Sequence, residues 1–432
     1  MTRVPSAPAR PRSLPEAAWV STLYFAEGLP YMLVRFLGGV TLTDWGVREA
    51  TLGFLNFLGL PWNTKFLWAP LVDLLGTRRG WLLAAEALLA VGAGVMAVLA
   101  GAGEGVAEPA GVTRAMLALL AMLAVVAATH DIGIDGFYME AIPDPDAQAR
   151  YTGARVTAYR AAVIFAKSVV VAVAGALSWV WGYVVVAALL CLLVVVHAVG
   201  LPRRQGPPRP ARRPGTFLAE YGRAFVSWLD QPQVGLVLAF VITYKLGDEV
   251  LFSMNTPFLL RELGLQKSQF SWINGVLGTA ASIGGSLLSA WAIGRWGLRR
   301  AIWPLTLGMN VNLWAYVALA WARPDPSTPA GLAAVAVGTA YEQLAAGLGN
   351  AVLVVYLMRT CKAEFKASHY AIASALPSLG GTFLGGLGGV VVESWGYVTL
   401  YILAFVAALP SMFCLLFLEL KDAPRTGGCS AK

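Results

Sequence analysis

Charged side chains inside long apolar runs are the most informative chemical feature of this 432-residue chain. A charge at the centre of a bilayer costs roughly 3 kcal/mol or more, so it needs a partner or a water-filled cavity. The basic residues at this depth are Arg35, Lys65, Arg160, Lys167 and Lys245. The acidic residues at a similar depth are Glu27, Asp131, Asp135, Asp248, Glu249 and Glu342. Side chains of these types could bind an anionic solute or carry protons.

The spacing of several of these charges places them on shared helix faces. Asp131 and Asp135 are four residues apart, so both carboxyl groups lie on one face of a helix. Arg160 and Lys167 are seven residues apart and share nearly one face of the next apolar segment. We therefore predict a binding site for an anionic solute at Arg35, Lys65, Asp131, Asp135, Arg160 and Lys167. For Arg160 and Lys167 the alternative is internal salt bridging that holds the helices together.

Glu27 and Glu342 are the predicted proton carriers. Each lies about ten residues into its apolar segment, which corresponds to ~15 Å at the helical rise. Burial of a lone carboxyl group favours its protonated form, and a coupling group must bind and release a proton. The alternative is a carboxylate held by a cation such as Arg35. We rank these two residues above Asp131 and Asp135, which neighbouring cations could keep ionised.

The segment from Val234 to Phe258 combines charges with a helix breaker. Lys245 can pair with Asp248 and Glu249 within one helix, so these three residues are weaker site candidates. The tripeptide Asn255-Thr256-Pro257 interrupts this segment, and Gly28-Leu29-Pro30 interrupts an earlier segment beside Glu27. Proline removes a backbone hydrogen bond, so both places predict points at which a helix can bend.

The composition is that of a membrane protein. The chain is 57% hydrophobic and 13% charged, with a mean hydropathy of +0.65. Soluble domains carry about 25% charged residues. The net charge of +8 lies mostly in short loops, which argues against a nucleic-acid-binding surface. The sequence shows no phosphate-binding loop, catalytic triad or metal-ligand cluster, so we predict no cofactor and neither an ATP-driven pump nor an enzyme.

Twelve apolar segments are long enough to cross a bilayer, which needs about 20 residues each. The first six are Ala17 to Thr43, Ala50 to Leu75, Gly80 to Gly101, Ala115 to Ile142, Thr152 to Ser178 and Trp181 to Gly200. The second six are Val234 to Phe258, Phe270 to Gly294, Ala301 to Ala322, Gly331 to Met358, His369 to Val392 and Tyr397 to Leu420. This predicts an all-α membrane protein with halves at 1–201 and 234–432 and a linker at 202–233.

Lysine and arginine predict the orientation of these segments. They gather in both tails, in every second loop and in the Pro- and Arg-rich linker PRRQGPPRPARRPG. The opposite loops hold Arg48, Arg114, Arg261, Lys267 and Arg323. Because positive loops stay in the cytoplasm, both termini and the linker are predicted to be cytoplasmic.

The two halves carry a related loop. Leu74 to Arg79 follows the second segment, and Arg295 to Arg300 follows the eighth. The first copy, with Asp73, Gly76, Arg78 and Arg79, resembles the G-x-x-x-D-x-x-G-R-[RK] loop of the major facilitator superfamily. We predict that Asp73, Arg78 and Arg79 form a cytoplasmic latch. In the second copy Gly294 takes the place of the aspartate, so such a latch would be one-sided.

Several blocks resemble the AmpG-like muropeptide permease family, a branch of that superfamily. They are KFLWAPLVD from Lys65 to Asp73, Arg78-Arg79-Gly80-Trp81, Asp131 with Asp135, Tyr159-Arg160, and Glu342 with Gly347, Gly349 and Cys361. The resemblance implies proton-driven import of anhydro-muropeptides across the bacterial inner membrane. The expected partners are an anionic saccharide or glycopeptide, protons and membrane lipids. The alternatives are a transporter of acetyl-CoA or a similar anion, a lipid flippase, and a membrane receptor that does not transport.

Overall fold

The computed structural model describes residues 14–106, 110–203, 222–223, 225–361, 366–418 and 420. Every regular element within these residues is a helix. Six of the helices are long and apolar enough to cross a membrane: Arg78–Gly103, Ala110–Ala141, Asp146–Ala176, Trp179–Gly200, Lys267–Trp296 and Ile372–Leu415. The last of these covers two predicted segments, and a positive φ of 78° at Gly396 marks the kink between them.

In the first half, each predicted segment lies on one helix or on a run of consecutive helical pieces. The first two runs are α1 (Glu16–Met32), η1 (Leu33–Leu37) and α2 (Gly38–Asp44), then α3 (Glu49–Phe54), η2 (Leu55–Gly59), α4 (Leu60–Thr64), η3 (Lys65–Leu67) and α5 (Ala69–Leu74). They are followed by α6 (Arg78–Gly103), α7 (Ala110–Ala141), α8 (Pro145–Ile164), η4 (Phe165–Val170), α9 (Val171–Ala176) and α10 (Trp179–Gly200).

The second half follows the same pattern. Its elements are α12 (Val234–Thr243), α13 (Leu246–Ser253), α14 (Asn255–Pro257), η5 (Phe258–Glu262), α15 (Lys267–Phe270), η6 (Ser271–Leu277), α16 (Gly278–Trp296), α17 (Leu298–Ala322), α18 (Pro329–Thr360) and α19 (Lys366–Leu415). The segments η1, η4, η5 and η6 are π-helical. Such segments are rare and frequently occur at functional sites.

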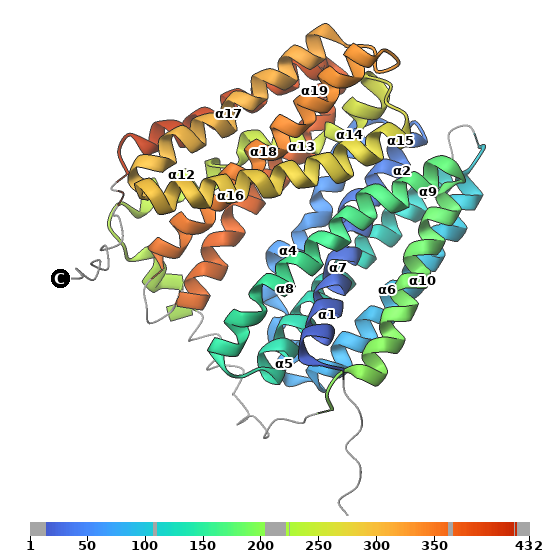
Figure 1. The fold of residues 1–432 in the computed structure, drawn as a ribbon, viewed down its shortest axis with the longest axis vertical. Coiled ribbons are helices and arrows are strands. Elements are labelled where there is room, and N and C mark those ends of the chain that lie inside the picture. Colours follow the sequence, from blue (N-terminus) through green and yellow to red (C-terminus); the bar gives the residue numbers. More distant parts are fainter. Residues whose placement is uncertain are drawn as a thin grey trace, which may run out of the picture.

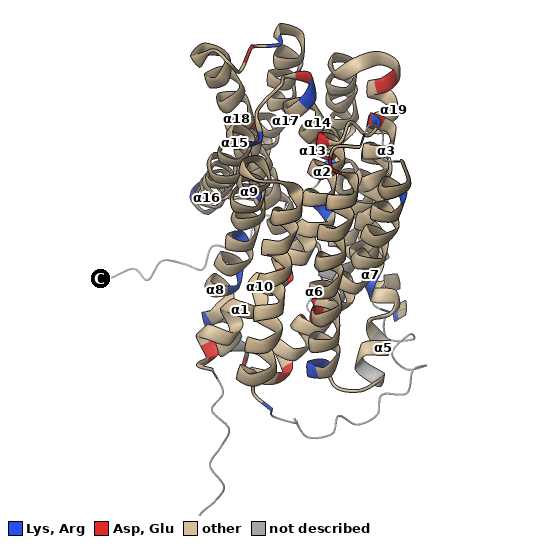
Figure 2. Cartoon of the chain, turned by 90° about the vertical axis from the view of Figure 1, so that its right-hand side faces the viewer, with Lys and Arg blue, Asp and Glu red and all other residues tan. Residues whose placement is uncertain are grey.

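The surface of the helices is suited to lipid. Figure 2 shows that most of their length carries no charge. Leu88, Val91 and Val98 on α6 are exposed. Apolar side chains in these positions satisfy a hydrocarbon environment, while the helical backbone satisfies its own hydrogen bonds.

Figure 1 shows the helices of the two halves as two bundles that meet near α2, α9, α14 and α15. Across this junction α2 contacts α14 and η5, α9 contacts α15, and α3 contacts α19. These elements border residues 44–49 and 263–267, which the charge pattern assigns to the outside. We call this end the outer side.

Ion pairs and hydrogen bonds join the bundles on the outer side. We call this set the outer latch: Asp44, Arg48, Glu49, Arg261, Lys267 and Glu393. Arg261 donates to the carbonyl oxygens of Thr43 and Val47 at 2.6 and 2.7 Å and to Glu49 Oε1 at 3.0 Å. Lys267 Nζ lies 2.7 Å from Asp44 Oδ2, and Arg48 lies 2.7 Å from Glu393 Oε2. The outer side is therefore closed in this conformation.

One part of the outer latch has a defined pH dependence. The hydrogen bond from Arg48, together with that from the backbone N–H of Ala50, lowers the pKa of Glu393 from its ordinary value. A carboxyl group whose pKa is lowered by folding contributes stability above its ordinary pKa and loses it as pH falls through the lowered value. This part of the outer latch is consequently intact at neutral pH.

The predicted orientation can be tested by cysteine labelling. We expect a membrane-impermeant maleimide added to intact cells to label Ser327→Cys, since Ser327 is exposed and follows Pro326, whose carbonyl oxygen accepts from Gln269 beside the outer latch. It should not label Gln205→Cys in the linker, which lies outside the described residues. Both changes are made in a background without the native cysteines, and lysed cells give the control for reactivity. Labelling of the linker position in intact cells would refute the orientation.

Candidate functional site

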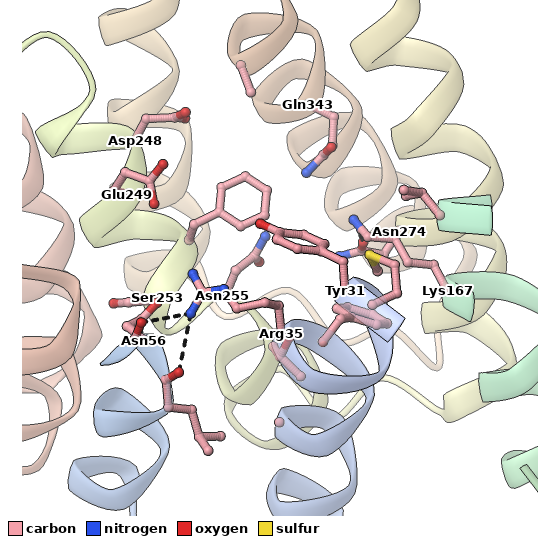
Figure 3. A pocket seen from close by; sticks show the side chains of 18 of the residues that line it. Tyr31, Arg35, Asn56, Lys167, Asp248, Glu249, Ser253, Asn255, Asn274 and Gln343 are labelled. Carbon is pink, nitrogen blue, oxygen red and sulfur yellow. Dashed lines mark hydrogen bonds between the residues drawn. The ribbon is translucent and has the colours of Figure 1, made fainter. Parts of the chain in front are cut away.

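A central cavity of about 350 Å³ lies between the two bundles. Small-molecule sites commonly measure about 300–1,000 Å³. Its walls come from α1, η1, α2, α3, η2, α8 and η4 in the first bundle and from α13, α14, η6, α16 and α18 in the second. Within the described part of the chain, the charged side chains that line it are Arg35, Arg160, Lys167, Lys245, Asp248 and Glu249. Figure 3 shows several of them converging on the same space.

Arg35 is fixed in the cavity wall by backbone groups. Its guanidinium donates to the carbonyl oxygen of Leu55 at 3.2 Å and to that of Asn56 at 2.8 Å. Both acceptors lie in η2, a 3₁₀ helix. Gly59 permits this approach, since a Cβ there would lie 3.2 Å from Arg35 Cζ. The alternative pairing of Arg35 with Glu27 is not seen among the described ion pairs.

Lys167 reaches across the cavity to the second bundle. Its Nζ donates to Asn274 Oδ1 at 2.9 Å, and its side chain is 8% exposed. It also lies 5.3 Å from the ring centroid of Phe36, within the range of a cation–π contact. The close approach of η4 to η6 at this level depends on Gly275, where a Cβ would overlap the Ser168 side chain. The structure thus places Lys167 in the cavity wall, and its role in binding a substrate stays a prediction.

Arg160 is the most available cation of this wall. It is half-buried and lines the cavity about two helical turns before Lys167. No hydrogen bond or ion pair of its side chain is seen with any residue that the structure describes. The alternative of salt bridges from Arg160 and Lys167 to Asp131 and Asp135 is not what the structure shows.

The other predicted binding residues form a separate cluster inside the first bundle. Lys65 contacts Asp131, while Asp135 accepts from the Tyr24 hydroxyl at 2.9 Å and from Arg155 at 3.3 Å. Neither Lys65 nor the two aspartates line the described part of the central cavity. The structure therefore divides the six predicted residues into three in the cavity and three in a paired internal cluster.

The two predicted proton carriers have different surroundings. Glu27 is half-buried and adjoins Asp131 in the internal cluster. Glu342 is fully buried, and its Oε2 accepts from Gln343 Nε2 at 2.9 Å. Its Oε1 has no partner among the residues described. Because Gln343 lines the cavity, Glu342 lies directly behind the cavity wall.

The predicted cytoplasmic latch makes contacts within the first bundle. Arg78 donates to the carbonyl oxygen of Gly136 at 2.9 Å, and Arg79 donates to that of Ala198 at 2.6 Å. These bonds hold the start of α6 against α7 and the end of α10. The side chain of Asp73 lies outside the described residues, so its role stays a prediction.

Neutral amides in the cavity were missing from the sequence-based site. Asn274 binds Lys167, Asn350 accepts from Lys245 at 2.8 Å, and Gln343 covers Glu342. An amide inside an apolar run gives a weak signal compared with a charge. Lys245 does pair with Asp248 and Glu249, as its spacing predicted. All three nevertheless line the cavity, so they are stronger candidates for the binding site than the sequence indicated.

A buried pair in the first bundle was also missed. Glu86 on α6 and His197 on α10 are both fully buried, with His197 Nδ1 2.9 Å from Glu86 Oε1. Each lies inside an apolar segment, so the cost of burying a charge could have identified both residues from the sequence.

Comparison with known proteins bears on both fold and function. The family model described as Major Facilitator Superfamily matches residues 57–341 and 238–431. The chain is 29% identical over 410 residues to the anhydromuropeptide permease of Escherichia coli K12, covering 93% of this chain and 79% of that protein. It is 22% identical over 413 residues to the AmpG 4 transporter of Rickettsia conorii, covering 92% and 95%. These matches confirm the resemblance drawn from the sequence.

Solved structures support the fold. The nucleoside transporter NupG superposes with a TM-score of 0.67 at 15% identity, covering 94% of this chain and 99% of that chain. The xylose transporter XylE from E. coli gives a TM-score of 0.66 at 12% identity, covering 95% and 97%. At such identities the likeness establishes the arrangement of helices, and the binding site must be argued from this chain's own residues.

Proposed function

This chain belongs to the Major Facilitator Superfamily, and we propose that it imports anhydromuropeptides or a related anionic cell-wall fragment, coupled to protons, across the bacterial inner membrane. The coarser function is established by the matches: the chain is a multi-pass membrane transporter and not an enzyme. The permease of E. coli supplies the substrate class.

The observation that carries the proposal is the basic wall of the central cavity. Arg35, Arg160 and Lys167 line it from the first bundle. A guanidinium binds a carboxylate through two parallel hydrogen bonds, and Arg160 is free of a described partner. The rings of Tyr31 and Phe252 also line the cavity and offer apolar faces to a sugar or peptide. This combination suits a bulky solute that carries carboxylates.

The closed outer side supports alternating access. In this mechanism one bundle rocks against the other around a fixed central site. The outer latch joins Arg48, Arg261 and Lys267 to the opposite bundle. The transport cycle includes a state in which the outer side is closed, as it is in this conformation. Import requires the outer latch to open, accept the solute and close again.

Uptake into proteoliposomes tests the substrate and the basic wall together. We expect the purified protein to take up labelled anhydromuropeptide, and Arg160→Met to lower that uptake about tenfold or more, since a charged hydrogen bond contributes about 1.5–3 kcal/mol. Arg160→Lys keeps the charge and should have a smaller effect. Arg114→Met provides the matched control, because Arg114 is exposed far from the cavity.

Acetyl-CoA serves as the competing ligand in the same assay. Uptake of acetyl-CoA without uptake of anhydromuropeptide would show that the basic wall binds a different anion and would contradict the proposed substrate. Equal uptake by Arg160→Met and Arg114→Met would show that Arg160 does not contribute to substrate binding.

A further inference from the structure

The charges that line the central cavity are divided between its two walls. The wall formed by the first bundle carries Arg35, Arg160 and Lys167 and, among the residues described, no carboxyl group. The wall formed by the second bundle carries Asp248 and Glu249 beside Lys245. Figure 3 shows Asp248 and Glu249 on the side opposite Lys167. One end of a bound molecule would meet cations, and the other end would meet carboxylates.

Lys245 neutralises part of the acidic wall. Its Nζ lies 3.3 Å from Asp248 Oδ2 and 3.9 Å from Glu249 Oε1, and it donates to Asn350 Oδ1 at 2.8 Å. One ammonium group therefore faces two carboxyl groups, and an acidic excess remains at this wall.

Asp248 presents an unsatisfied acceptor in this wall. Its residue is 4% exposed, and its Oδ1 has no hydrogen-bond partner in the part of the chain that the structure describes. Figure 3 shows the carboxyl group directed toward the cavity. A buried acceptor without a partner loses its hydration and gains nothing in exchange, so a ligand that donates a hydrogen bond here recovers that loss.

A second cavity beside Glu249 provides further space for such a ligand. This cavity measures about 190 Å³ and shares Lys245, Glu249 and Asn350 with the central cavity. It extends between α13, α18 and α19, where Leu353 and Leu357 contribute apolar surface. An aminoalkyl chain could lay its methylene groups on this surface and place its ammonium group at Glu249.

We propose that the transported molecule is a zwitterion whose primary ammonium group binds at Glu249 and Asp248, while its carboxylates bind at the basic wall. The inference deepens the proposed function and rests on it. For anhydromuropeptides, the proposal predicts that the protein binds compounds with a free side-chain amine more tightly than compounds in which that amine is blocked.

The test uses one pair of ligands: an anhydromuropeptide with a free side-chain amine, and the same compound after acetylation of that amine. Acetylation removes the positive charge and leaves the carboxylates in place. We expect the acetylated compound to inhibit uptake about tenfold or more weakly, the factor that one charged hydrogen bond supplies. Glu249→Gln should abolish the difference by weakening the free-amine compound alone. Glu104→Gln, an exposed carboxyl outside both cavities, should retain it.

The outcomes separate this inference from the proposed function. Retained affinity of Glu249→Gln for the acetylated compound shows that the variant is folded, and Asp248→Asn gives a second measurement at the same wall. Equal affinity of the native protein for both compounds overturns the zwitterion site and leaves muropeptide import standing. Failure of both compounds to bind overturns the proposed function as well.

Discussion

Replacement of Glu342 with Gln is expected to abolish accumulation of substrate driven by a proton gradient while leaving downhill exchange intact. Glu342 is fully buried and its Oε1 accepts no hydrogen bond from a described group, while Lys167 and Lys245 interact with it electrostatically without an ion-pair contact. An ionised carboxyl group in a buried site is costly, so a coupling role requires Glu342 to carry a proton in one state of the transport cycle. Opening of the cavity to the other side would change that environment and allow the proton to leave. Gln keeps the shape and the hydrogen bonding of the protonated form but cannot release a proton.

The size of the effect follows from the gradient. One pH unit supplies about 1.4 kcal/mol per proton, which supports roughly tenfold accumulation. We expect native protein in proteoliposomes to approach this ratio and Glu342→Gln to equilibrate near equal concentrations. Counterflow of labelled against unlabelled substrate measures the exchange that should survive.

Glu27→Gln is the informative comparison. Glu27 adjoins Asp131, and Lys65 already neutralises part of this cluster. We therefore expect Glu27→Gln to retain part of the gradient-driven accumulation. If both variants concentrate substrate as well as the native protein, the proton path lies elsewhere. If Glu27→Gln alone loses accumulation, the internal cluster and not Glu342 carries the proton.

The sequence predicted which charges lie inside apolar segments and the pairing of Lys245 with Asp248 and Glu249 within one helix, but it did not predict partners on other helices. The cost of a charge in a bilayer singled out Asp131, Asp135, Arg160 and Lys167. Spacing along one helix shows which residues share a face, but it does not show which neighbouring helix that face meets. The bundle places Lys65 against Asp131, and this leaves Arg160 and Lys167 directed at the cavity.

The positions at which helices deform were also only partly predictable from the sequence. Gly28-Leu29-Pro30 was predicted to interrupt its helix, but α1 continues through Pro30 to Met32 and the irregular part is the π-helical η1. Gly28 has a packing role instead: a Cβ there would lie 2.9 Å from the Ala162 side chain of α8. The predicted interruption at Asn255-Thr256-Pro257 is confirmed, since α13 ends at Ser253, Met254 departs from helical geometry, and the three-residue α14 passes directly into the π-helical η5. Proline alone therefore does not determine where a packed helix deforms.

Closure of the outer side depends on glycines that bring α19 against α3. A Cβ at Gly389 would overlap the backbone carbonyl of Glu49, and a Cβ at Gly53 would lie 2.8 Å from the carbonyl oxygen of Gly386. Backbone atoms cannot move aside as a flexible side chain can. The crowding of glycines in this helix is thus a requirement of contact between the two bundles.

Gly389→Ala is accordingly expected to hold the outer side open and to reduce transport strongly. Overpacking costs about 1–3 kcal/mol, which shifts the balance between open and closed states by roughly five- to 150-fold. Uptake should fall by a similar factor. A cysteine placed in the cavity by Thr256→Cys should react with an impermeant reagent from the outer side in Gly389→Ala and much more slowly with Gly389 unchanged.

Gly284→Ala is the control, because a Cβ at that position on α16 meets no atom within 4 Å. Alanine is the better helix former, so this variant should be at least as stable as the native protein. Equal uptake and equal labelling in the two glycine variants would show that α3 and α19 adjust without opening the outer side. Loss of transport with a cavity that stays inaccessible from outside would place the damage in folding, which size-exclusion chromatography of the purified variant would reveal. The opposite pair of results, an accessible cavity with little transport, would identify the contact of Gly389 with Glu49 as a step that the transport cycle must complete.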